Sequence, residues 1–111
     1  MRVICTGVAA AAIALPAAAH EIDRGLSVTY RCAEGVELRA AYINTLEGAA
    51  FAVVSHDGRL LPMEAGPTGS GVRYLSLDDS KLVWHTKGKD GFLAHDDSAE
   101  TPIVRDCIAE D

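Results

Sequence analysis

Apolar and polar residues alternate at two-residue spacing along most of the chain after residue 25. In residues 26–32 and 36–42 every second residue is apolar or aromatic, so each segment would present one apolar face as a strand. Glu34-Gly35 supplies the turn between them. No stretch keeps the i, i+3, i+4, i+7 spacing of an amphipathic helix for three turns. The pattern therefore predicts an all-β protein.

Turn-forming residues divide the rest of the chain into short strands. Asp57-Gly58 is a strong two-residue hairpin signal. Residues 64–71 hold three glycines, a proline, a threonine and a serine, which favour an irregular loop. Gly88 and Gly91 are expected to bracket the exit of a later hairpin, whose large side chains are Tyr74 and Trp84. The predicted strands are 26–32, 36–42, 49–55, 59–63, 72–77, 81–86, 92–96 and 103–108.

Eight short antiparallel strands at roughly ten-residue spacing favour a closed sheet. Closure removes the unpaired edges of the sheet, and an interior of this size is just filled by side chains. We therefore predict a small eight-stranded antiparallel β-barrel. A barrel that carries a small ligand is disfavoured, because little room remains inside.

Residues 1–19 have the features of a cleaved secretory signal peptide. This segment carries one charge (Arg2), an apolar run over 8–15 and Ala17-Ala18-Ala19 before the predicted cleavage site. The apolar run is shorter than the roughly 20 residues that a membrane-spanning helix needs. The expected mature protein, residues 20–111, is one domain that begins with His20 rather than a lipid-modified cysteine. We expect a soluble, exported protein without a membrane anchor.

The net charge indicates which kinds of partner are suitable, and the cysteines indicate a covalent link within the domain. Residues 20–111 hold nine basic and sixteen acidic residues, a net charge of −7, which disfavours nucleic acid or anionic membranes and suits a basic partner. Cys32 and Cys107 are the two cysteines of this part, and in an oxidising compartment they most simply form one disulfide. That disulfide would link the first predicted strand covalently to the last.

Candidate catalytic residues are few. Ser70 lies in Thr-Gly-Ser-Gly, which is not the Gly-x-Ser-x-Gly elbow of a serine hydrolase, and an all-β chain lacks the strand-to-helix turn behind that motif. His85 has no carboxylate nearby in sequence, and we interpret it as a surface residue. The main interpretation is therefore a protein without enzymatic activity or cofactor.

Metal binding gives the alternative hypothesis. If cleavage exposes His20, its α-amine and imidazole could bind copper together with His56, His85 or His95, as in an exported copper carrier. The spacing of these histidines is not diagnostic. His95-Asp96-Asp97 could hold a hard cation, but an Asp pair in a loop is more often solvated turn chemistry.

Basic residues are concentrated in one part of this acidic chain. Arg73, Lys81, Lys87 and Lys89 all fall between residues 70 and 89, while acidic residues dominate both flanks. The sequence therefore predicts a local positive tip on a negative domain. Lysines on the solvent face of an ordinary hairpin would give the same pattern.

Several short motifs resemble those of the periplasmic and membrane-bound inhibitors of c-type lysozyme. The motifs are Tyr30-Arg31-Cys32 followed by a glycine, the small-Tyr-x-Asn of residues 41–44, Ser70-Gly71-Val72-Arg73-Tyr74, Thr86-Lys87-Gly88, and a cysteine near the carboxyl end. Together they span nearly all of the mature domain. The signal peptide and His20 make the chain most similar to the periplasmic type.

The resemblance implies an eight-stranded barrel, a Cys32–Cys107 disulfide, and inhibition by a loop inserted into the catalytic cleft of an animal c-type lysozyme. The matching partner-binding residues are Ser70, Gly71, Arg73, Tyr74, Thr86, Lys87 and Gly88. One position departs from the family, which usually has tyrosine where this chain has Leu82.

The chemistry of Ser70 and Lys87 agrees with that role. A c-type lysozyme uses one protonated and one ionised carboxyl group. A serine hydroxyl both donates and accepts hydrogen bonds, so Ser70 suits either carboxyl form, and the Lys87 ammonium suits the ionised one. The affinity, the preferred lysozyme and the oligomeric state of the inhibitor are left open by the sequence.

Overall fold

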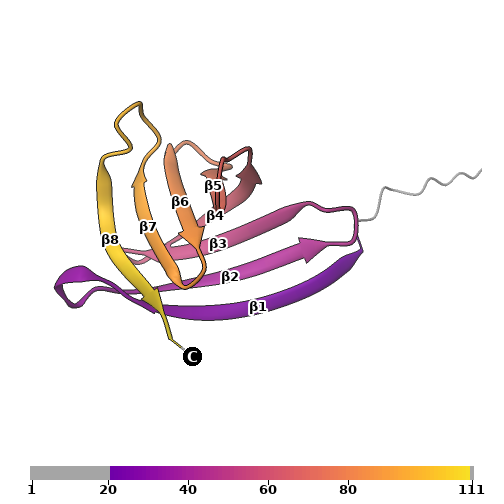
Figure 1. Ribbon diagram of the computed structural model, residues 1–111, viewed down its shortest axis with the longest axis horizontal. Coiled ribbons are helices and arrows are strands. Elements are labelled where there is room, and N and C mark those ends of the chain that lie inside the picture. The colour runs from indigo at the N-terminus through magenta and orange to yellow at the C-terminus, as the bar shows by residue number, and fades with distance from the viewer. Residues whose placement is uncertain (1–20, 111) are drawn as a thin grey trace, which may run out of the picture.

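The computed structural model describes residues 21–110, and this part of the chain forms a closed antiparallel β-barrel (Figure 1). Each strand pairs with the next, and the last pairs with the first. The strands are β1 (Ile22–Arg31), β2 (Glu37–Thr45), β3 (Ala50–His56), β4 (Arg59–Gly66), β5 (Val72–Ser76), β6 (Leu82–Lys87), β7 (Asp90–His95) and β8 (Pro102–Ala109), with one 3-10 turn, η1 (Ala33–Gly35), after β1. The predicted fold class is confirmed. The predicted signal peptide and His20 lie outside the described residues.

The barrel interior is filled by the alternating apolar residues of the strands. Trp84 is fully buried, and Tyr74 lies opposite it in the β5–β6 register. Gly91 is not at the exit of the hairpin as expected but inside β7, where an added Cβ would come within 2.9 Å of the Trp84 ring. The absent side chain leaves space for the indole. The buried core comprises Tyr30, Leu38, Ala40, Ala52, Val54, Leu61, Met63, Tyr74, Leu82, Trp84, Leu93, Val104 and Cys107.

The predicted loop over residues 64–71 is too long. β4 continues through Gly66, which pairs with Arg73 of β5, so the loop covers only residues 67–71. Alternation continues to Ala65, and pairing with β5 outweighs the turn tendency of the nearby glycines. Pro67, which has no N–H to donate to a ladder, follows the last paired residue.

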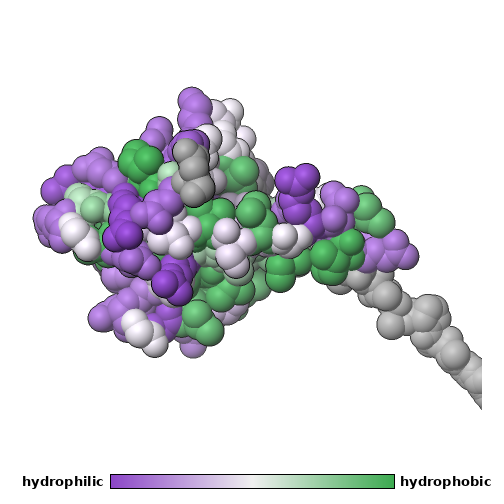
Figure 2. Space-filling model, turned by 90° about the horizontal axis from the view of Figure 1, so that it is seen from below, coloured by the Kyte–Doolittle hydropathy of each residue, from purple (hydrophilic) through white to green (hydrophobic). Residues whose placement is uncertain are grey.

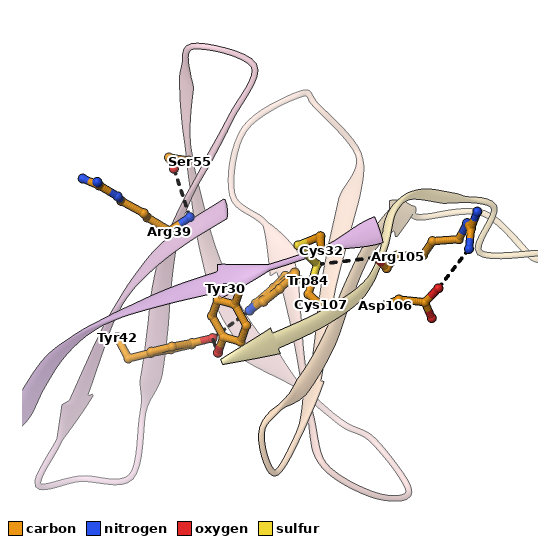
Figure 3. Close-up of a disulfide and its surroundings, with 9 residues drawn as sticks. All are labelled: Tyr30, Cys32, Arg39, Tyr42, Ser55, Trp84, Arg105, Asp106 and Cys107. Atoms are coloured by element: carbon orange, nitrogen blue, oxygen red, sulfur yellow. Dashed lines mark hydrogen bonds and ion pairs between the residues drawn. A yellow bond between two sulfur atoms is a disulfide. The ribbon is translucent and has the colours of Figure 1, made fainter. Parts of the chain in front are cut away.

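The seam between β1 and β8 is short and carries the disulfide. The two strands pair only at Tyr30↔Ala109 and Arg31↔Ile108. Cys32 follows β1 directly and is bonded to Cys107 of β8 across a sequence separation of 75 residues (Figure 3). The predicted disulfide is confirmed, and it covalently fixes the closure of the barrel.

A bulge in β8 turns Cys107 towards the interior. Gly91 pairs with Cys107 while Leu93 pairs with Val104, so two residues of β8 stand opposite one residue of β7. Asp106, within this bulge, has a left-handed backbone with φ of 56°. In a regular strand Val104 and Cys107 would face opposite sides, because their separation is odd. The bulge allows both to be buried.

The start of β1, the end of β2 and the turn from β2 into β3 project beyond the barrel (Figure 1). In the described chain, β1 before Tyr30 pairs with β2 alone. Apolar surface continues from the body of the protein onto this projecting part (Figure 2), where Ile22 and Leu26 of β1 and Leu46 of the β2–β3 turn are exposed. No helix within residues 21–110 is long and apolar enough to cross a membrane.

Candidate functional site

The barrel brings the loop that carries Ser70 next to the strand that ends at Lys87. Val72, the first residue of β5, pairs with Thr86 of β6. The loop of residues 67–71 therefore enters β5 beside the carboxyl end of β6. Ser70 and Lys87 are both exposed there, so two residues that are seventeen positions apart in sequence belong to one surface.

Gly71 makes this close approach possible. Its φ is 69°, in the left-handed region that favours glycine. A Cβ at this position would lie 2.2 Å from the Thr86 carbonyl oxygen and 3.1 Å from the Lys87 Cβ. The backbone of the Ser70 loop thus lies directly against the Thr86–Lys87 backbone, and only glycine fits.

Lys87 is the last residue of β6 and stands at the base of a tight turn. Gly88, with φ of 61°, and Lys89 connect Lys87 to Asp90, its partner in the β6–β7 register. No hydrogen bond or ion pair joins the Lys87 side chain to another residue within 21–110. The ammonium is therefore available to an external carboxylate.

Tyr74 and Thr86 lie in the strands that carry the site and are less exposed than Ser70 and Lys87. Tyr74 is buried, with its ring centroid 5.6 Å from that of Tyr42. Thr86 and Gly88 border a recess of about 290 Å³ at the mouth of the barrel, which Tyr74 also lines. Tyr74 therefore belongs to the core that supports the site, and its role in partner binding stays a prediction.

The Tyr30 and Tyr42 hydroxyls at this mouth form a hydrogen-bonded cluster with Trp84 (Figure 3). The Trp84 indole N–H donates to the Tyr42 hydroxyl at 2.8 Å, and the Tyr42 and Tyr30 hydroxyl oxygens are 2.6 Å apart. Burial raises the pKa of Tyr30, Tyr42 and Tyr74 above the usual value. The cluster therefore stays protonated and supplies the buried indole with an acceptor.

Arg73 is engaged within the protein. Its Nε and Nη2 atoms both donate to Glu100 Oε2, at 2.9 and 2.7 Å, and Nη2 also lies 3.4 Å from Asp96 Oδ1. These contacts tie β5 to the loop between β7 and β8. Lys81 precedes β6 whereas Lys87 ends it, so the two lysines lie at opposite ends of the strand. The prediction of one positive tip is therefore wrong, because Arg73 is neutralised and Lys81 lies elsewhere.

Leu82, where the family usually has tyrosine, is a core residue. Its side chain is buried. The Leu82 backbone N–H donates to the Ser76 hydroxyl at 2.9 Å, and the same hydroxyl donates to the Leu82 carbonyl oxygen at 3.0 Å. Leu82 therefore serves here as a packed core residue, and its main chain is tied to Ser76 of β5.

The alternative copper site is only partly described. His56 ends β3, His85 lies in β6, and His95 ends β7. Within residues 21–110, no three His, Cys, Asp or Glu side chains come together in a way that could hold a metal ion. His20, on which the copper hypothesis depends, lies outside this range.

Two interactions of the site were not predicted from the sequence. His85 Nε2 lies 3.1 Å from the main-chain carbonyl oxygen of Ser70, and Glu100 binds Arg73. A main-chain acceptor has no sequence signature. Arg73 and Glu100 are 27 residues apart, and no motif around either residue indicates that they form an ion pair.

The fold and the disulfide define a small, covalently closed antiparallel barrel, and comparison with known proteins places that barrel in a family. The family model described as membrane-bound lysozyme-inhibitor of c-type lysozyme matches residues 30–102. The chain therefore belongs to this family of lysozyme inhibitors, as its motifs indicated.

Two solved structures are similar over their whole length. PliC-St, the periplasmic lysozyme inhibitor of c-type lysozyme from Salmonella typhimurium, is 25% identical, with a TM-score of 0.70 over 79% of this chain and 100% of that chain. Pseudomonas aeruginosa MliC, solved in complex with hen egg white lysozyme, is also 25% identical, with a TM-score of 0.64 over 95% of this chain and 100% of that chain. No curated protein matches the sequence.

Proposed function

We propose that this protein is a non-enzymatic inhibitor of c-type lysozyme that acts in the periplasm and protects bacterial peptidoglycan. The observation that carries the proposal is the juxtaposition of Ser70 and Lys87, through Gly71, in a chain of the lysozyme-inhibitor family. The complex of P. aeruginosa MliC with hen egg white lysozyme supports the choice of partner.

The proposed inhibitory contact inserts the Ser70 loop into the catalytic cleft. The Lys87 ammonium, which no described side chain neutralises, pairs with the ionised catalytic carboxylate. The Ser70 hydroxyl donates to or accepts from a carboxyl group. Both catalytic groups are then occupied, and water and substrate are excluded from the cleft.

Net charge supports the encounter with such a partner. The expected mature chain carries −7, and animal c-type lysozymes are basic, so the two proteins attract each other at long range. Lys87 is a local exception to this acidity that suits an acidic cleft. The predicted signal peptide and the non-cysteine residue His20 support a soluble periplasmic location.

The test is inhibition of hen egg white lysozyme by purified residues 20–111. Lys87→Ala leaves the catalytic carboxylate without its cation in a closed interface, and binding should weaken by about 2–5 kcal/mol. Ser70→Ala removes a neutral hydrogen-bonding group and should weaken binding by about 1–3 kcal/mol.

Lys81→Ala is the matched control, because it removes a lysine at the other end of the same strand. We expect it to change binding by less than about 1 kcal/mol. A parent protein that leaves lysozyme fully active would refute the proposed function. Equal losses for Lys81→Ala and Lys87→Ala would instead show that overall charge, not this site, determines binding.

A further inference from the structure

The main chain of Ser70 is held by side chains rather than by a strand ladder. Thr68 Oγ1 donates to the Ser70 carbonyl oxygen at 3.1 Å, and His85 Nε2 lies 3.1 Å from the same oxygen. No main-chain hydrogen bond joins Pro67–Ser70 to other residues within 21–110. Because a carbonyl oxygen only accepts, His85 must carry its hydrogen on Nε2.

These two bonds differ in what they fix. Thr68 belongs to the same loop, so its bond shapes the loop without tying it to the barrel. His85 belongs to β6, which is paired on both sides, with Arg73 opposite it in β5 and Phe92 opposite it in β7. The His85 bond therefore joins the loop to the sheet.

The imidazole ring is itself held in place. His85 is half-buried, and its ring packs edge-to-face on Phe92, with centroids 5.4 Å apart and an interplanar angle of 65°. Packing against Phe92 of β7 thus holds the ring with its Nε2 atom directed at the loop. Lys87 lies two residues further along the same strand.

We infer that His85 is a positioning residue that holds the exposed Ser70 loop in its binding conformation through the Ser70 carbonyl. This inference rests on the proposed function. A loop that is ordered before binding loses less conformational entropy when it enters a cleft. His85 acts through Ser70 and need not touch the partner.

The first test compares two substitutions of His85. His85→Phe keeps an aromatic ring against Phe92 but removes the Nε2 donor, and should weaken inhibition of hen egg white lysozyme about five- to ten-fold. His85→Gln keeps an N–H donor and should retain inhibition within about two-fold of the parent. Both thermal midpoints should stay within about 4 °C of the parent, as expected for a surface bond. Equal inhibition by parent and His85→Phe, or equal losses for Phe and Gln, would overturn the inference.

A double-mutant cycle tests whether His85 acts through Ser70. If it positions that residue, His85→Phe should weaken inhibition much less in a Ser70→Ala background than in the parent. Full additivity of the two losses would show that His85 contributes independently and would contradict a positioning role.

A measurement on the free protein separates this inference from the proposed function. The ¹⁵N heteronuclear NOEs of residues 68–70 should fall in His85→Phe and be retained in His85→Gln. Unchanged NOEs in His85→Phe would overturn the positioning role even in a working inhibitor. A parent that fails to inhibit lysozyme would refute the function, while the NOEs would still decide whether His85 orders the loop.

Discussion

The seam of the barrel and its candidate binding surface are held together in different ways. At the seam, two register pairs between β1 and β8 are reinforced by the Cys32–Cys107 disulfide. At the binding surface, the Ser70 loop is held by the fit of Gly71 against Thr86 and by a hydrogen bond from His85. One region is fixed covalently, and the other by a few weak contacts of specific shape.

Because the two regions are held in different ways, we expect one to determine the stability of the fold and the other to determine the affinity for lysozyme. Substitutions at the seam and in the aromatic cluster beside it should lower the free energy of unfolding and leave the affinity of the intact fold unchanged. Substitutions at the Ser70 loop should lower the affinity for lysozyme with little effect on unfolding, because the loop is exposed and buries few apolar atoms. The following variants test that separation.

Removal of the disulfide should have the largest effect. With Cys32 and Cys107 both replaced by serine, the seam keeps its two register pairs, the main-chain bond from Glu110 to Thr29 and the Arg31–Glu110 ion pair, but no covalent link. The free energy of unfolding should then fall by about 2–5 kcal/mol. Denaturant unfolding of the variant and the oxidised parent measures this loss, and the chemically reduced parent is the control. A loss below about 1 kcal/mol would mean that strand pairing, not the disulfide, maintains the seam.

The Tyr42 hydroxyl should have the next largest effect on stability. It accepts the hydrogen bond of the fully buried Trp84 indole. Tyr42→Phe leaves that N–H without its acceptor, and the free energy of unfolding should fall by about 1–3 kcal/mol. Inhibition measured well below the unfolding midpoint should match the parent. A large loss of inhibition in a fully folded variant would contradict the proposal that this cluster affects stability but not lysozyme binding.

Alkaline pH should weaken the same cluster. Burial raises the pKa of Tyr30, Tyr42 and Tyr74 above the ordinary tyrosine value of about 10, so the folded protein keeps phenolic protons that the unfolded chain releases. The associated stability is fully present below pH 10 and is lost as the pH rises further, since the unfolded chain then binds fewer protons. Unfolding curves from pH 8 to 11 measure this decline, which should be reduced in Tyr42→Phe.

The sequence predicted the barrel well because alternation and turn residues are local signals. The predicted strands on either side of Glu34-Gly35 and of Asp57-Gly58, and the predicted strands 72–77 and 81–86, lie within a few residues of the observed strands. The bulge at Asp106 could not be predicted, because a left-handed aspartate inside a strand breaks the alternation on which the prediction depends. Gly91 was misplaced for a related reason, since its role depends on the distant Trp84 ring.

The candidate site was predicted by resemblance rather than by physical pattern. Ser70 and Lys87 carry no signal that distinguishes them from an ordinary loop serine and strand lysine. The contacts that assemble the site join distant segments through the backbone, as in the approach of Gly71 to Thr86 and the bond from His85 to Ser70. The partner-binding roles of the seven predicted residues stay predictions.

Substitution of Gly71 should affect binding more than stability. Alanine would require a left-handed backbone, which costs about 1–2 kcal/mol, and its Cβ would meet the Thr86 carbonyl oxygen unless the loop moves. Since the loop is exposed, it can move away from β6 without opening the barrel. We expect inhibition to weaken by at least about ten-fold, measured as the inhibition constant. Gly69→Ala is the control, because a Cβ there meets no atom within 4 Å.

Arg73→Ala should have the smallest effect and tests where the binding surface ends. Arg73 is 24% exposed and binds Glu100 and Asp96, so its loss should lower the free energy of unfolding by about 1 kcal/mol or less. Glu100→Gln removes the charge of its main partner and should give a similar loss, because both variants disrupt one ion pair. Neither should change inhibition more than about two-fold if Arg73 serves the barrel rather than the partner. If Arg73→Ala weakens inhibition about ten-fold while Glu100→Gln does not, the guanidinium leaves Glu100 to bind lysozyme, and the binding surface extends from the Ser70 loop onto β5.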